Sequence, residues 1–226
     1  MAYPEKVKNW RLYLITDEKI GKGRSHLHMA EAAIHGGADV IQLRDKTASS
    51  RELYLSACQI RELTREHNIP FIINDRLDIA LAVQADGVHL GQEDLPLRVA
   101  RKILGKDFIL GTSAASLQEA IQAEADGADY LGVGPVYEAR GTKADAGEPL
   151  GLSLISRIRQ HCRIPVIAIG GINPENVSDV LKAGANGVAV ISAIVSAPDI
   201  REATRNFKRA LSTAASKNEN ERYHHI

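Results

Sequence analysis

Two short apolar segments of this chain end abruptly in carboxylate and amide side chains. The first, Phe71–Ile73, runs into Asn74 and Asp75, and the second, Gly87–Leu90, is followed shortly by Asp94. Parallel α/β enzymes place their chemistry at the carboxyl ends of the strands, so both aspartates are predicted to face one cavity. Two hard oxygen ligands suit Mg²⁺ beside a phosphorylated substrate. The alternative is helix capping, because each aspartate precedes a predicted helix and aspartate is a good N-cap.

Amide and basic side chains alternate at the end of another apolar run, Val40–Leu43. Gln42, Arg44 and Lys46 alternate along the chain, and alternate side chains of an extended segment point the same way. One amide, one guanidinium and one ammonium would then enter the cavity together and hold a polyanion. The alternative is a solvated strand end in which the cations pair with Asp45. Because this alternation continues an apolar strand, the interpretation as a binding site is favoured. Together with Asn74, these basic side chains also favour the magnesium site beside them.

A second anion site is indicated nearer the C-terminus. Gly170 and Gly171 follow an apolar run and open a predicted helix that has Pro174 near its first turn. Bare backbone amides at a helix N-terminus bind anions, and α/β barrels often bind phosphate after the seventh and eighth strands. Ile191 and Ser192, at the end of the last apolar run, would complete this site. For the glycine pair alone, a tight turn is the alternative.

A loop rich in glycine and alanine around Thr142 and Lys143 is a candidate lid, with an ordinary surface loop as the alternative. Two anion sites together predict two phosphorylated substrates, one of which bears a diphosphate. His89 lies just before a strand end, where a packed, hydrogen-bonded core histidine is the more common role. We therefore do not assign His89 to the site.

Strand-length apolar runs alternate with amphipathic helical stretches along the whole chain. The expected strands are Leu12–Ile15, Val40–Leu43, Phe71–Ile73, Gly87–Leu90, Phe108–Gly111, Tyr130–Val133, Val166–Ile169 and Val188–Ile191. The expected helices are Ser25–His35, Ser50–His67, Leu77–Val83, Leu95–Leu104, Leu117–Ala125, Leu152–His161, Pro174–Ala183 and Asp199–Ala214. Continuous Val, Ile and Leu runs indicate strands buried on both faces, hence a parallel sheet. Eight such units favour an α/β fold closed as a single (β/α)8 TIM barrel over a doubly wound open sheet.

A partial internal repeat supports the barrel. A glycine or other small residue closes a helix and a short polar residue then leads into a strand, four times, two units apart. The four copies are Gly37-Ala38-Asp39-Val40, Ala85-Asp86-Gly87-Val88, Gly127-Ala128-Asp129-Tyr130 and Gly184-Ala185-Asn186-Gly187.

Composition bounds the class of protein. The formal net charge of zero gives no basic footprint for nucleic acid or for an anionic membrane. Cys58 and Cys162 lie far apart, which is typical of reduced thiols in a cytoplasmic protein, and no apolar run reaches the length of a membrane helix. We expect an N-terminal extension over residues 1–11, a catalytic barrel over 12–213 and a polar, disordered tail over 214–226. Composition leaves a homo-oligomer open.

Several motifs, in order around the predicted barrel, resemble those of the thiamine-phosphate synthase family. They are Tyr13–Asp17, Gln42–Lys46, Ile73–Arg76, His89–Asp94, Gly132–Tyr137 and Ala168–Ile172. The resemblance runs from about Leu12 to Phe207 and is far more specific than any single motif. It implies a transferase that couples a hydroxymethylpyrimidine diphosphate to a thiazole phosphate, forming thiamine phosphate and releasing diphosphate.

The resemblance also implies a role for each matching residue. Gln42, Arg44, Lys46 and Asn74, with Leu43 and Asp45 in the same segment, would hold the pyrimidine diphosphate. Asp75 and Asp94 would bind one Mg²⁺ per site, and Ser113 and Lys143 would contact the diphosphate. The thiazole phosphate would lie against Gly171, Ile191 and Ser192. Arg44, Lys46, Ser113 and Lys143 are the expected catalytic residues, because they face the charge that develops on the departing diphosphate.

The sequence departs from the family pattern at two places. The family usually has a Pro-Thr pair before Thr-Lys in the loop after the sixth strand, whereas this chain has the longer segment Glu138–Lys143. Arg140 or Thr142 would then take over the contact with the thiazole phosphate. The family also often has a histidine where this chain has Ala115.

Two rival functions stay open at the level of sequence. A thiazole tautomerase of the same superfamily would bind a thiazole phosphate without diphosphate chemistry, but it usually lacks the Asn-Asp and Gln-Glu-Asp elements that are complete here. A non-catalytic barrel that binds a phosphorylated ligand is the other alternative.

Overall fold

Eight parallel strands close into a barrel in the computed structural model, which describes residues 7–138 and 148–223, with side chains up to residue 216. The strands are β1 (Leu12–Thr16), β2 (Val40–Leu43), β3 (Phe71–Asn74), β4 (Gly87–Leu90), β5 (Ile109–Ala114), β6 (Tyr130–Val133), β7 (Val166–Ile169) and β8 (Gly187–Val190). Each pairs with the next, and β8 returns to β1 with Leu12 opposite Val188. The prediction of a (β/α)8 barrel is confirmed.

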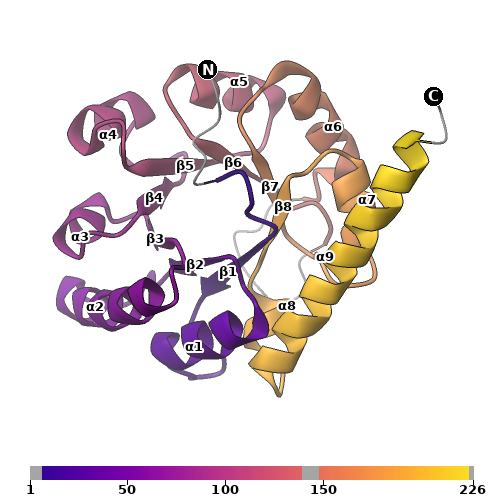
Figure 1. Cartoon of the computed structure of the whole chain (residues 1–226). Coiled ribbons are helices and arrows are strands. Elements are labelled where there is room, and N and C mark those ends of the chain that lie inside the picture. The colour runs from indigo at the N-terminus through magenta and orange to yellow at the C-terminus, as the bar shows by residue number, and fades with distance from the viewer. Residues whose placement is uncertain (1–6, 139–147, 224–226) are drawn as a thin grey trace.

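Helices surround the barrel, as Figure 1 shows. They are α1 (His26–Gly36), α2 (Ser50–Glu66), α3 (Leu77–Ala82), α4 (Leu97–Leu104), α5 (Leu117–Ala125), α6 (Gly151–His161), α7 (Val177–Lys182), α8 (Ser192–Val195) and α9 (Ile200–Tyr223). Side-chain caps fix several starts: Ser49 and Glu52 form a reciprocal capping box at α2, and Ser116 caps α5. No helix in the described part of the chain is long and apolar enough to cross a membrane.

Several element boundaries differ from those predicted. Strand β5 continues to Ala114, because its last residues still pair with β6, whereas we expected the strand to end at Gly111. The short helix α8 was not predicted, since four residues carry no helical periodicity. Helix α9 runs to Tyr223, beyond Ala214, where we expected it to end. Polar residues can continue a helix that packing has already started.

The internal repeat has a structural explanation at the amino ends of the odd strands. In each copy the polar residue accepts a hydrogen bond from the backbone amide of the first or second residue of the preceding strand. The donors are the amides of Leu12, Phe71, Leu110 and Val166, and the acceptors are the side chains of Asp39, Asp86, Asp129 and Asn186, at 2.8, 2.8, 2.8 and 2.9 Å. The repeat therefore fastens neighbouring strands together at the end of the barrel opposite the predicted site.

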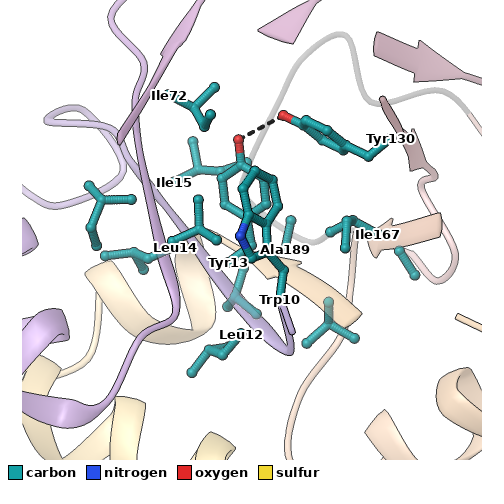
Figure 2. Close-up of a cluster of buried hydrophobic side chains, with 14 of the residues drawn as sticks. Trp10, Leu12, Tyr13, Leu14, Ile15, Ile72, Tyr130, Ile167 and Ala189 are labelled. Atoms are coloured by element: carbon teal, nitrogen blue, oxygen red, sulfur yellow. Dashed lines mark hydrogen bonds between the residues drawn. The ribbon is translucent and has the colours of Figure 1, made fainter. Parts of the chain in front are cut away.

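The segment before β1 is part of the barrel core. Val7 is buried, and Trp10 is only 3% exposed. The Trp10 ring meets the rings of Tyr13 and Tyr130 edge-on, with centroids 5.5 and 5.2 Å apart, and Figure 2 shows the three side chains together. Residues 7–11 therefore pack into the fold, although the sequence indicated only an extension over 1–11.

Candidate active site

One cavity of about 490 Å³ opens at the carboxyl ends of the strands. Every strand contributes to its wall; examples are Ile15, Gln42, Asn74, His89, Ser113, Gly132, Ile169 and Ala189. Its wall combines apolar side chains such as Ile15 and Ile167 with polar ones such as Gln42 and Ser113, which is the usual make-up of a site for small molecules. The cavity therefore lies where the sequence placed the chemistry.

The alternating set after β2 divides between the cavity and its rim. Gln42 is 2% exposed and donates from Nε2 to the Tyr13 hydroxyl at 2.9 Å. Arg44 is buried, lines the cavity and forms a close ion pair with Asp17 at the end of β1. The Lys46 side chain is 54% exposed, and its Nζ lies 3.5 Å from Asp75. Leu43, which alternates with them, is fully buried and is not part of the cavity wall.

The carboxylate of Asp45 is engaged by the chain itself. Its Oδ1 accepts hydrogen bonds from the amides of Thr47 and Ala48 at 2.8 and 2.9 Å, and Oδ2 lies 3.3 Å from Nε2 of His26. Partial burial opposes the charge, but these hydrogen bonds lower the pKa of Asp45 to about 2. The structure thus gives Asp45 a clear role in shaping the loop between β2 and α2.

Asp75 and Asp94 come together beside the cavity, although the prediction was that both would face it, and neither belongs to its wall. Burial raises the pKa of Asp75, and the hydrogen-bonded, negatively charged Asp94 raises it further, against the opposing charge of Lys46. The backbone of Asp75 is left-handed at φ +62°, which is costly for a residue other than glycine. Its amide donates to the carbonyl of His89 at 2.8 Å, so β4 holds this conformation in place.

The glycine turn after β7 lies at the opposite side of the same cavity. Gly170 and Gly171 have φ values of +97° and +65°. A β-carbon at Gly170 would lie 2.6 Å from Pro135, and one at Gly171 would lie 2.7 Å from Tyr137, so both positions require glycine. Ile191 and Ser192, at the start of α8, line the cavity beside this turn.

Ser113 is exposed on the cavity wall at the end of β5, and the half-buried Asn74 lies on the wall at the end of β3. The Ser113 hydroxyl lies 3.1 Å from Nε2 of His89, and its carbonyl accepts a hydrogen bond from Gln92 at 2.5 Å. The sequence had left His89 out of the site. Gly132 in β6 was a signal for His89, because a glycine inside a strand often marks a place that another group approaches closely. Here that group is the His89 ring.

Known proteins share both the sequence and the fold of this chain. The model of the thiamine monophosphate synthase family matches residues 12–194. This chain belongs to the thiamine monophosphate synthase family.

Individual relatives of the family agree over almost the whole length. A thiamine-phosphate synthase of Methanospirillum hungatei is 58% identical over 196 residues, which cover 87% of this chain and 95% of the relative. That of Chloroflexus aurantiacus is 51% identical, covering 93% of this chain and 97% of the relative. The solved thiamine phosphate pyrophosphorylase of Pyrococcus furiosus superposes with a TM-score of 0.84 at 43% identity, covering 92% of this chain and 98% of that one.

One of the two departures from the family pattern lies at the cavity. Ala115 lines it, in the place where the family often has histidine. The predicted site residues Arg140, Thr142 and Lys143 lie outside the described residues. Glu148 and Leu150, the first cavity-lining residues after this loop, are described.

Proposed function

We propose that this protein joins a hydroxymethylpyrimidine diphosphate to a thiazole phosphate and releases diphosphate, acting as a thiamine-phosphate synthase in the cytoplasm. One observation carries the proposal. The paired carboxylates of Asp75 and Asp94, with Lys46 beside them, follow the ends of β3 and β4, whose residues Asn74 and His89 line the same cavity as Gly171 and Ser192. A diphosphate at the first group and a monophosphate at the second would bring the two substrates together.

The residues at the first group fit a Mg²⁺ ion. Burial and then the neighbouring carboxylate of Asp94 raise the pKa of Asp75, and a divalent cation relieves the repulsion between the two carboxylates. Asp75 and Asp94 would hold the ion, and when bound it would offset negative charge on the departing diphosphate.

The other polar groups have roles set by their positions. Arg44 and Lys46, with Ser113 and Lys143, would stabilise the charge that develops on the diphosphate as the bond to the pyrimidine methylene carbon breaks. Gln42 and Asn74 would orient the pyrimidine against the apolar side chains of the cavity. Arg44 is already desolvated and held by Asp17, so it needs little rearrangement to act.

The second substrate completes the reaction. Gly171, Ile191 and Ser192, with Arg140 or Thr142, would hold the thiazole phosphate so that its ring nitrogen captures the electron-deficient carbon. Orientation of two bound partners then supplies much of the rate, and no covalent nucleophile is required.

Thiamine phosphate formation from the two substrates, measured with and without Mg²⁺, tests the proposal. Product should form only with Mg²⁺, and Asp75→Asn and Asp94→Asn should each lower kcat/KM at least about 100-fold. Asp78→Asn is the matched control, because Asp78 lies on α3, where its exposed carboxylate pairs with Arg76.

The contrary outcomes are distinct. Isomerisation or simple binding of the thiazole phosphate without coupling would indicate the tautomerase or the non-catalytic barrel. Full activity of both aspartate variants in saturating Mg²⁺ would contradict the metal site.

A further inference from the structure

A network of hydrogen bonds crosses the interior of the barrel, and all of its members line the cavity. It runs from Gln42 through the hydroxyls of Tyr13 and Tyr130 to His89 and ends at Ser113, with successive distances of 2.9, 2.9, 3.0 and 3.1 Å. Figure 2 shows the second of these bonds, between Tyr13 and Tyr130. The five residues come from β2, β1, β6, β4 and β5, so no single segment of the sequence contains this hydrogen-bond network.

The number of protons on each group determines which group donates and which accepts in this hydrogen-bond network. Burial raises the pKa of both Tyr13 and Tyr130, so each phenol keeps its single proton. Among the described residues, the Tyr13 hydroxyl bonds to Gln42 and Tyr130, and Gln42 donates. If Tyr130 also donated to Tyr13, the Tyr13 proton would be buried without an acceptor. Tyr13 therefore donates to Tyr130, which in turn donates to Nδ1 of His89.

This direction fixes the tautomer of His89. Because Nδ1 accepts, the proton of the neutral ring is on Nε2, which lies 3.1 Å from the Ser113 hydroxyl oxygen. Ser113 then accepts from His89, and its own proton is turned toward the cavity. We propose that His89 is a positioning residue that makes the Ser113 hydroxyl a hydrogen-bond donor to the departing diphosphate. The inference rests on the proposed contact between Ser113 and the diphosphate.

Two glycines within strands leave space for the side chains of this hydrogen-bond network. A β-carbon at Gly111 in β5 would lie 2.1 Å from Cζ of Tyr130, and one at Gly132 in β6 would lie 3.0 Å from Cε1 of His89. Glycine weakens the interior of a strand, so its presence at both positions is typical of a place that another group approaches closely. The barrel is therefore built to hold these two side chains in these places.

Two substitutions of His89 separate positioning from packing. In His89→Asn the amide reaches about as far as Nδ1, so it can satisfy Tyr130 but not Ser113. In His89→Gln the amide reaches the position of Nε2 and can donate to Ser113. We expect His89→Asn to lower kcat at least about tenfold, the loss expected for one hydrogen bond to a charged group, with KM changed much less. His89→Gln should recover most of this loss.

A double-mutant cycle with Ser113→Ala identifies the route of the effect. If His89 acts through Ser113, replacing His89 by Asn should cost little further activity once the hydroxyl is gone. Additive losses, or full kcat in His89→Asn, would overturn the positioning role and leave the proposed function intact. Full activity of Ser113→Ala would instead remove the contact with the diphosphate on which the inference rests.

A measurement on the unmodified protein covers the case in which the variants fold poorly. The ¹⁵N resonances of His89 distinguish a ring protonated on Nε2 from one protonated on Nδ1. A proton on Nε2 supports the proposal, and a proton on Nδ1 contradicts it, whatever the activity of the variants.

Discussion

At the scale of single residues, Asp75 is the residue of the site with the most unfavourable conformation and electrostatic environment. This residue combines a left-handed backbone with a carboxylate that is partly buried beside Asp94. The surrounding structure holds it there through the hydrogen bond from its amide to His89 and the charge of Lys46. Such an arrangement is unfavourable without a cation, so the carboxylate pair is expected to govern how Mg²⁺ affects stability.

The raised pKa of Asp75 predicts how that effect depends on pH. Its folded pKa lies above that of the unfolded chain, so protonation favours the metal-free fold, and this contribution is lost as the pH rises through the folded pKa. Mg²⁺ requires the ionised pair. We therefore expect Mg²⁺ to raise the melting temperature at neutral pH and to raise it much less at acidic pH, where Asp75 is protonated. Thermal unfolding with and without Mg²⁺ at both pH values measures this.

Asp94→Asn is the control at this scale. The amide oxygen can still accept the hydrogen bond from the amide of Gly91, which Asp94 Oδ2 receives at 2.6 Å. Repulsion with Asp75 is removed, so the metal-free variant should be at least as stable as the parent at neutral pH, and Mg²⁺ should stabilise it little. An equal Mg²⁺ effect in the variant, or at both pH values in the parent, would contradict the assignment.

At the scale of elements, the repeated polar residues connect consecutive βα units. Asp86 illustrates the arrangement: its carboxylate accepts from the amide of Phe71 at the start of β3 and pairs with Arg61 of α2 at 2.6 Å. Its own amide donates to the carbonyl of Phe71 at 2.9 Å. One side chain thus fixes the relative positions of β3, β4 and α2 at the end of the barrel away from the cavity.

The chain supplies a matched control for this role, since Asn186 does the same at β7 without a charge. Asp86→Ala leaves the amide of Phe71 without its acceptor and should lower the free energy of unfolding by about 1–3 kcal/mol. Asp86→Asn keeps an acceptor and loses only a partly exposed ion pair, so its cost should be below about 1 kcal/mol. Urea unfolding of the two variants compares them; equal losses would show that the ion pair with Arg61 dominates.

At the scale of the whole molecule, the barrel is closed between β8 and β1 and packed from beneath by Trp10. The final helix, α9, packs along α1 and α7 beside this closure (Figure 1). A β-carbon at Gly36 of α1 would lie 2.5 Å from Thr204, so the two helices cross in close contact. The first and last parts of the described chain therefore stabilise the same region of the barrel.

Trp10→Ala tests the contribution of the segment before β1. Trp10 is almost fully buried against Tyr13 and Tyr130, and removing a large aromatic side chain from a core costs about 3–5 kcal/mol. Urea unfolding should show a loss of this size, and Trp10→Phe should lose clearly less because it keeps most of the packing. A loss below about 1 kcal/mol in Trp10→Ala would show that residues 7–11 are dispensable for the fold.

The sequence by itself determined the number and order of the strands and the residues at their carboxyl ends. These features follow from local rules: uninterrupted aliphatic runs form buried parallel strands, and alternate side chains of an extended segment share a direction. The latter rule predicted that Gln42 and Arg44 reach the same cavity, and the strand ends predicted that Asp75 and Asp94 lie together beside it.

Only the tertiary structure decided which side chains meet across the barrel. It engages Asp45 with its own loop, places Trp10 beneath Tyr13 and Tyr130, and connects Tyr130 to His89. The position of a residue along its own strand determines which way its side chain points from that strand. Contacts between strands far apart in the sequence depend on how the sheet closes and on where glycines leave space, and neither is set by any short segment.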